Sequence, residues 1–294
     1  MTLSRIVLFS GAIVAAAGLL TACGASTNRA ADEKTVVAAF YPLAFAAQQI
    51  VGAGTVVRNL TPAGAEPHDL ELTAGDVRAV DRAKLVLYLG DGFQPGVDRA
   101  VAHRAGPSLD LLVGREFRPG RDNHDGAPRD PHIWLDPVRY AAVVRAIGAA
   151  LADVDAAELL VARLDRLDAM FRAGLAHCLR RQIVTSHAAF GYLAERYGLE
   201  QIPLEGLAPE AEPSAKGIAE LVDRVEQSGA TTVFFETLVS PRLAETVARE
   251  AGVATAVLNP LEGLGADEVA AGADYFSVMR ANLAALRKAL GCGA

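Results

Sequence analysis

The sequence predicts an α/β protein with two lobes, each built on a parallel sheet, joined by helices. Short β-branched runs recur in two groups of three, and segments with helical spacing alternate with them. Alternating strands and helices favour parallel sheets. With 294 residues, of which 51% are apolar, the chain can fill one large core or two modest ones. We therefore expect one sheet in each half of the chain.

Six apolar runs rich in β-branched residues supply the expected strands: 35–40, 55–60, 85–89, 182–187, 231–237 and 253–258. Three segments with helical spacing lie among them, at 74–83 after a possible cap at Thr73, at 218–228 and at 241–251. This pattern predicts an N-terminal α/β lobe over residues 35–137 and a C-terminal α/β lobe over residues 182–294.

A helical segment separates the two groups of strands. Residues 138–181 contain no proline and are rich in Ala, Leu, Arg and Asp, and apolar residues from Leu159 to Phe171 recur at helical intervals. We expect two helices here, the second long, with a break near Asp153 to Asp155. Such a connection leaves a cleft between the lobes.

The N-terminus is typical of an exported bacterial lipoprotein. Arg5 precedes an uncharged run at 6–20, which is too short to span a bilayer and matches the hydrophobic region of a signal peptide. The following "LTACG" resembles a lipobox. We expect a signal peptide at 1–22, lipid-modified Cys23 and a tether at 23–34, which anchor the protein to the outer side of the cell membrane. The alternative is an ordinary cleavage site that carries a cysteine by chance.

Charge and cysteine content narrow the possible partners. The net charge is −7, and removal of residues 1–22, whose one charged side chain is Arg5, leaves −8. This balance disfavours nucleic acid and direct binding to anionic lipid head groups, and it is compatible with capture of a cation. In an oxidising compartment, Cys178 and Cys292 form an even pair, so a disulfide is favoured over two free thiols.

The histidines are the main candidates for chemistry. None of the six has the short spacing of a zinc finger or of H-E-x-x-H, so a metal site would need distant segments. His187 ends an expected strand, His68 lies in a turn-rich loop after another, and His132 precedes the interlobe helices. Ligands of open α/β sheets bind beyond the carboxyl ends of strands, so these three can converge on the cleft. Three imidazoles leave one position of a zinc tetrahedron open.

Structural roles are the alternative for each histidine, because a single histidine beside apolar residues is more often structural than a ligand. We interpret His103 and His177 as residues of helical faces and His124 as a solvated loop residue, with a weak recruiting ligand as its alternative. Dinucleotide, P-loop and G-x-S-x-G motifs are absent from the sequence. Ser186 and His187 are adjacent in a strand and point to opposite faces, which disfavours a nucleophile and base pair.

Several segments, in order, resemble one family: "AGAEPHDLELTAGDV", "DPHIWLDP", "VTSHAAFGYLAERYGL", "PEAEPSAKGIAELV", "TTVFFETLVSPRLAETVAREAG" and "YFSVMRANLAAL". They are similar to the metal-binding solute-binding lipoproteins of zinc and manganese ABC importers, the zinc-uptake type (cluster A-I). The resemblance covers nearly the whole mature chain. It implies two pseudo-symmetric α/β lobes bridged by a long rigid helix, with a metal held in the interlobe cleft.

The resemblance also implies a ligand set. His68 matches the first family histidine and His132 the second. His187 stands at the third position, which is histidine in zinc-type members and glutamate in many manganese-type members. An all-imidazole set suits Zn(II) better than Mn(II), which prefers carboxylate oxygens. The resemblance therefore favours zinc.

The fourth position departs from the family pattern. Many relatives have aspartate where this chain has Asn259 in "VLNPLEGL". A neutral amide is a weaker ligand, so coordination by Asn259, a water held on the metal and a hydrogen-bonding role all stay open. Glu66 and Glu236 are candidate nearby carboxylates, with loop charge and structural pairing as alternatives. Asp69 or Asp136 could orient a histidine, although turn and helix-cap roles are simpler.

The sequence thus predicts a non-enzymatic, monomeric receptor that captures Zn(II) outside the cell as a transported ligand and passes it to an ABC permease. A manganese or iron(II) receptor of the same family is the nearest alternative. A zinc hydrolase is a third, because three histidines with an open position also form a catalytic arrangement, but no motif supplies its general base. A surface adhesin is a fourth, which the sequence neither supports nor excludes.

Overall fold

The computed structural model describes residues 34–113, 129–207 and 214–293. The expected signal peptide, the lipidation site Cys23, most of the tether and His124 lie outside these ranges. In the part that is described, no helix has both the length and the apolar character needed to cross a membrane.

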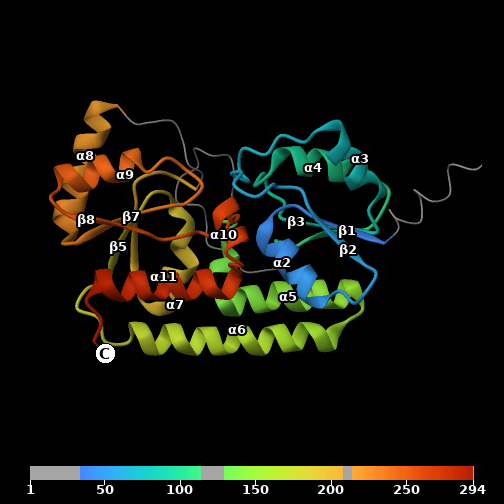
Figure 1. Cartoon of the computed structure of the whole chain (residues 1–294). Helices are drawn as coiled ribbons and strands as arrows, with labels where there is room; N and C mark the ends of the chain where they lie inside the picture. Colours follow the sequence, from blue (N-terminus) through green and yellow to red (C-terminus); the bar gives the residue numbers. More distant parts are fainter. Residues whose placement is uncertain (1–33, 114–128, 208–213, 294) are drawn as a thin grey trace, which may run out of the picture.

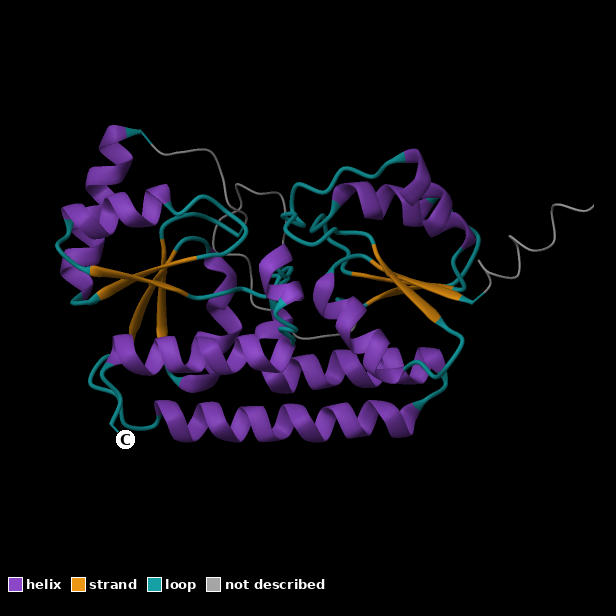
Figure 2. Ribbon diagram, viewed as in Figure 1, coloured by secondary structure: helices purple, strands orange, loops and turns teal. Residues whose placement is uncertain are grey.

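Two four-stranded parallel sheets form the framework (Figures 1 and 2). The first has the order β2-β1-β3-β4 and consists of β1 (Thr35–Ala38), β2 (Val56–Asn59), β3 (Leu85–Tyr88) and β4 (Ser108–Asp110). The second has the order β6-β5-β7-β8 and consists of β5 (Gln182–Thr185), β6 (Glu200–Pro203), β7 (Thr232–Phe235) and β8 (Ala254–Val257). In each sheet the second strand pairs with one side of the first strand and the third strand pairs with its other side, followed by the fourth. Both halves therefore have the same topology. The predicted parallel α/β class is confirmed.

Each sheet has one strand that the sequence pattern does not reveal. β4 has three residues, "SLD", and β6 reads "EQIP". Both are edge strands, where one side of the backbone faces away from the sheet and polar residues are tolerated. Their sequences therefore lack the apolar run by which the six other strands are recognised.

Helices flank the two sheets. In the first half these are α2 (Tyr41–Ile50), α3 (Ala74–Arg82) and α4 (Pro95–Ala102). In the second half they are α7 (Gly191–Tyr197), α8 (Ala215–Ser228), α9 (Arg242–Glu250), α10 (Ala266–Ala270) and α11 (Tyr275–Leu290). The three segments predicted from helical spacing correspond to α3, α8 and α9. Thr73 does cap α3, through a capping box with Asp76.

Two antiparallel helices connect the halves: α5 (Pro137–Leu151) and α6 (Val154–Leu175). The break predicted near residue 153 lies there, because Ala152 adopts the left-handed conformation and Asp153 caps α6 through the N–H of Ala156. Gly148 lets the two helices approach closely, since a Cβ at this position would collide with Ala157. In Figure 1, α6 lies along one side of the molecule and passes beneath both halves.

One hydrophobic core runs through both halves. It joins the first sheet, the connecting helices and α11, while a smaller cluster lies under α8 and α9. The main core does not divide at residues 137 and 181. The division of the chain into two lobes and interlobe helices at these residues therefore stays a prediction. A disulfide between Cys178 and Cys292 ties the segment after α6 to the segment after α11.

Candidate metal centre

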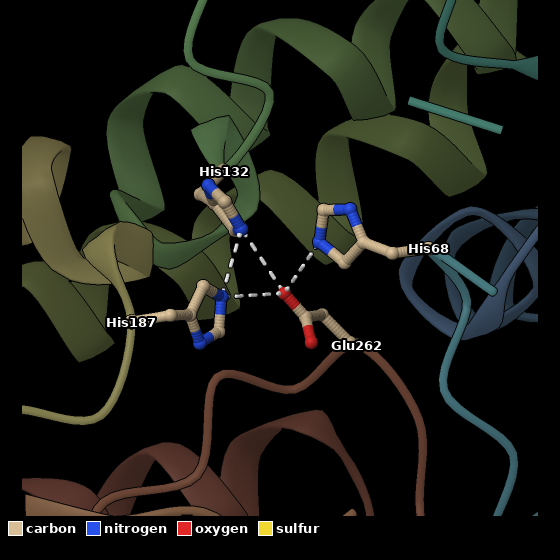
Figure 3. A group of neighbouring side chains, drawn as sticks. All are labelled: His68, His132, His187 and Glu262. Carbon is tan, nitrogen blue, oxygen red and sulfur yellow. Dashed lines mark hydrogen bonds and ion pairs between the residues drawn. The ribbon is translucent and has the colours of Figure 1, made fainter. Parts of the chain in front are cut away.

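Three histidines and one glutamate from four separate loops come together: His68, His132, His187 and Glu262 (Figure 3). His68 lies in the loop after β2, His187 is two residues beyond the end of β5, and Glu262 lies between β8 and α10. His132 precedes a short 3₁₀ helix (Ile133–Leu135) that leads into α5. The three strands end at the edges where parallel sheets place their ligands. We call these four residues the metal cluster.

The donor atoms of the metal cluster lie close enough together to bind one ion. All four lie within 4.8 Å of one another. The Oε1 atom of Glu262 is 3.0 Å from Nε2 of His132, 3.2 Å from Nε2 of His187 and 3.5 Å from Nε2 of His68. The Nε2 atoms of His132 and His187 are 3.3 Å apart. Each imidazole therefore offers the same ring nitrogen to a common centre.

Two buried carboxylates orient two of these rings. Nδ1 of His132 lies 2.8 Å from Oδ1 of Asp130, and Nδ1 of His187 lies 2.7 Å from Oε1 of Glu236. The same oxygens accept the backbone N–H groups of the two histidines. A carboxylate on Nδ1 fixes the tautomer in which Nε2 is free to bind a metal and raises its basicity. Glu236 is thus placed as an orienting residue rather than as a donor to the centre.

Asp130 was not among the expected orienting residues. Asp136, one of the two candidates from the sequence, is the N-cap of α5, where its side chain accepts the N–H groups of Val138 and Arg139. The signal for Asp130 was local: in "DPH" the aspartate stands two residues before the histidine, the spacing at which its side chain can accept that residue's N–H.

The electrostatics of the cluster favour a bound cation. His132, His187 and Glu262 are completely buried. Burial would lower the pKa of His187, but Glu236 and Glu262 raise it well above its ordinary value, and Asp130 and Glu262 likewise raise the pKa of His132. Burial would raise the pKa of Glu262, but the imidazoles hold it well below its usual range. The imidazoles and the buried carboxylates therefore stabilise each other's charged forms.

His68 and Glu66 complete the surroundings. Burial lowers the pKa of His68 and outweighs its attraction to Glu262, so this ring is ready to bind as neutral imidazole. Burial and then repulsion from Glu262 raise the pKa of Glu66 to about 8. Oε1 of Glu66 accepts the N–H of His68 at 3.2 Å. Glu66 therefore shapes the His68 loop and does not belong to the metal cluster.

The expectation of Asn259 as a fourth ligand is not supported by its contacts. Its Oδ1 accepts the N–H of Leu261 at 2.7 Å, and its Nδ2 donates to Thr237 Oγ1 and Glu268 Oε1, both at 3.0 Å. Its polar atoms are thus engaged outside the cluster, and the oxygen that lies among the three imidazoles is Oε1 of Glu262. Leu261, which lies between Asn259 and Glu262, has a φ of 58°, a left-handed conformation that turns the chain. Because of this turn, the side chains of Asn259 and Glu262 point to different surroundings. In the sequence, Glu262 is marked only as the single carboxylate within "NPLEGL".

Among the described residues, the two other histidines lie outside the metal cluster. His103 is the C-terminal cap residue of α4, and His177 follows the end of α6. Both are exposed. Trp134, next to the cluster, is buried against His132, Phe40 and Phe93.

Three imidazoles and one carboxylate, all buried except the partly buried His68, are drawn from both halves of a two-sheet α/β fold. This arrangement defines a metal-binding receptor of the two-lobed class. The family described as "Zinc-uptake complex component A periplasmic" matches residues 36–289. The chain belongs to this family.

Individual relatives agree with this assignment. The high-affinity zinc uptake system protein ZnuA of Bacillus subtilis (strain 168) is 35% identical over 311 aligned residues, which cover 96% of this chain and 98% of that protein. The zinc-binding protein AdcA of Streptococcus pyogenes serotype M3 is 37% identical over 86% of this chain. The chain spans 55% of the length of that AdcA.

Solved structures show the same fold. The Zn(II)-bound ZnuA-like domain of Streptococcus pneumoniae AdcA is 35% identical with a TM-score of 0.74, covering 87% of this chain and 98% of that domain. The laminin binding protein Lmb of Streptococcus agalactiae, described as having adhesin and metal transporting activity, is 26% identical with a TM-score of 0.78, covering 87% and 99%.

Proposed function

We propose that this protein is the zinc receptor of an ABC importer, and that His68, His132, His187 and Glu262 bind the ion it carries. The observation that carries the proposal is the metal cluster: four donor residues, three of them buried and His68 partly buried, whose ligand atoms lie within 4.8 Å of one another. Two of its histidines have the buried carboxylate partners that metal-binding imidazoles typically use.

The donor set favours zinc over manganese. Three imidazole nitrogens and one carboxylate oxygen match the ligands and the coordination number that Zn(II) prefers, whereas Mn(II) favours carboxylate-rich sites of higher coordination. Glu262 also supplies the negative charge that Asn259 could not. A manganese or iron(II) receptor remains the rival within the family.

The same donor set argues against a zinc hydrolase. A catalytic zinc keeps a coordination position for water, and three protein ligands are usual there. With Glu262 as a fourth donor, a tetrahedral zinc has no position left for a water to be activated. The chain is therefore proposed to be a receptor and not an enzyme, with Zn(II) as its transported ligand.

The receptor is proposed to act outside the cytoplasm, anchored through lipid on Cys23, and to work as a monomer that delivers zinc to a permease. The disulfide between Cys178 and Cys292 fits an oxidising compartment. A relative in Streptococcus pneumoniae, 36% identical, is named a zinc-binding lipoprotein.

Equilibrium dialysis of the mature chain tests the site. We expect one tightly bound Zn(II) per chain, lost in the His132→Ala/His187→Ala double variant. The matched control is His103→Ala/His177→Ala, which removes two exposed histidines outside the metal cluster and should leave binding unchanged. Tight binding that survives the first double variant would refute the ligand assignment.

Competition and turnover test the rivals. Excess Mn(II) should fail to displace Zn(II) from the wild-type protein, and a preference for Mn(II) would contradict the choice of metal. Metal-dependent hydrolysis of ester or peptide substrates, abolished in the His132→Ala/His187→Ala variant, would contradict the receptor assignment.

A further inference from the structure

The loop that carries Glu262 is held at its base by other parts of the fold. Asn282 of α11 is buried and accepts the N–H of Asn259 at 2.9 Å, while its Nδ2 donates to the carbonyl of Asn259 at 2.7 Å. The next carbonyl, of Pro260, accepts from the indole of Trp134 at 2.7 Å. The backbone before Glu262 is thus fixed to α11 and to the segment that follows His132.

The oxygen of the Asn259 side chain shapes the turn into Glu262. Oδ1 accepts the N–H of Leu261 at 2.7 Å, two residues along the chain, which is the pattern of an Asx turn. Leu261 has a φ of 58°, a left-handed conformation that non-glycine residues rarely adopt without support. The residue after this turn is Glu262, whose carboxylate enters the metal cluster.

The nitrogen of the same side chain joins two loops. Nδ2 donates one hydrogen to Thr237 Oγ1 and the other to Glu268 Oε1, each at 3.0 Å. Thr237 directly follows Glu236, which orients His187. Glu268 in turn accepts the N–H of Gly265 through Oε2 at 2.7 Å and so caps α10. One amide therefore connects the loop of Glu236 with the loop of Glu262.

We infer that Asn259 is a positioning residue for Glu262, and that its partner Glu268 makes an amide, rather than a carboxylate, the suitable group at this position. The inference rests on the proposed zinc function. An aspartate side chain at this position keeps an oxygen for the N–H of Leu261, but it places a second carboxylate where the hydrogen bond to Glu268 is now made. Two carboxylates at 3.0 Å repel each other, so the loop shifts and takes Glu262 with it.

The change Asn259→Asp separates this role from that of a ligand. If residue 259 is a ligand, the introduced carboxylate would bind a cation more tightly than the amide does, whatever stands at position 268. If it is a positioning residue, the change should weaken Zn(II) binding by about 10- to 100-fold, the usual effect of changing a group that supports a metal ligand.

A second variant restores the pairing. In Asn259→Asp/Glu268→Gln, the glutamine can donate from its nitrogen to the new carboxylate and still accept the N–H of Gly265 with its oxygen. The hydroxyl of Thr237 can rotate to donate as well. We expect this double variant to recover most of the lost zinc affinity. Glu268→Gln alone should lose less than Asn259→Asp, because its oxygen can still accept from Asn259.

The experiment is a set of four proteins, the wild type and these three variants, titrated with Zn(II) against a chelating dye and with Co(II) by absorption. Four-coordinate Co(II) absorbs much more strongly in the visible than six-coordinate Co(II). The Co(II) band should weaken in Asn259→Asp and return in the double variant. A loss of melting temperature without a change in the Co(II) band would show a merely structural role and overturn the inference.

Other outcomes are equally decisive. Tighter zinc binding in Asn259→Asp would show that residue 259 is a ligand. Unchanged affinity in Asn259→Asp, or a double variant no better than Asn259→Asp, would also overturn the positioning role. Failure of the wild type to bind one Zn(II) would refute the proposed function itself, which the dialysis of the wild type detects separately.

Discussion

Replacing Glu262 with glutamine removes the anionic donor of the metal cluster while keeping the shape of the side chain. Glu262 has no exposed surface, and its Oε1 is 3.0 to 3.5 Å from the three imidazole nitrogens. Removing one partner of a buried, hydrogen-bonded charge pair typically costs about 2–5 kcal/mol, equivalent to roughly 30- to 4000-fold in affinity. Because water cannot replace the lost charge at a buried position, we expect Zn(II) affinity to fall within this range.

Thermal unfolding in buffered free zinc measures the loss independently. Zinc that binds only the folded protein stabilises it by RT ln(1 + [Zn]/Kd), about 4 kcal/mol at 1000 times Kd. A Kd raised 100-fold reduces that stabilisation to about 1.4 kcal/mol at the same free zinc. The melting temperature gained on adding zinc should therefore shrink markedly in Glu262→Gln.

The matched control is Glu71→Gln, at an exposed glutamate outside the metal cluster. It should keep both the zinc affinity and the zinc-induced shift of the wild type. The assignment of Glu262 as a ligand would be refuted if Glu262→Gln bound zinc with an affinity within about threefold of that of the wild type. A change of about threefold in affinity is a difference in binding free energy well under about 1.4 kcal/mol.

Three further predictions follow from the same geometry. Zinc affinity should fall as pH is lowered, because protons compete with the ion for the imidazoles. Since the pKa of His187 is raised well above its ordinary value, calorimetry at pH 7 should detect protons released on zinc binding. Zinc binding without proton release would contradict this raised pKa. Asp130→Asn should weaken Zn(II) binding about 10- to 100-fold, measured by dye competition, and unchanged affinity would show that the orientation of His132 is not limiting. Replacing Cys178 and Cys292 with serine opens a loop of 114 residues and should cost up to about 5 kcal/mol in denaturant unfolding, with zinc affinity retained; loss of zinc binding in the folded variant would contradict the separation of disulfide and site.

Much of the fold could be predicted because its signals are local. Apolar runs and helical spacing are properties of short segments, and they indicate the connecting helices and six of the eight strands in the part of the chain that the structure describes. The edge strands β4 and β6 could not be found in this way, because they are short or polar and depend on pairing with a neighbouring strand.

In the candidate site, too, the residues with a local sequence signal could be predicted, and those whose position depends on contacts between distant segments could not. The three histidines could be singled out because each lies in a loop near the end of a strand or the start of a helix. The orienting role of Glu236 could not be predicted from the sequence, because its contact with His187 depends on the pairing of Thr185 with Phe234 across β5 and β7. The place of Glu262 in the cluster could not be predicted either, because the direction of its side chain depends on the left-handed turn at Leu261. The family pattern indicates Asn259 at the fourth position instead.

A crystal structure of the zinc-loaded protein, with anomalous scattering recorded on both sides of the zinc edge, tests the central claim most directly. We predict one anomalous peak bound by Nε2 of His68, His132 and His187 and by a carboxylate oxygen of Glu262, at about 2.0–2.2 Å in tetrahedral geometry. A peak bound by Asn259 in place of Glu262, or a peak elsewhere in the molecule, would contradict it.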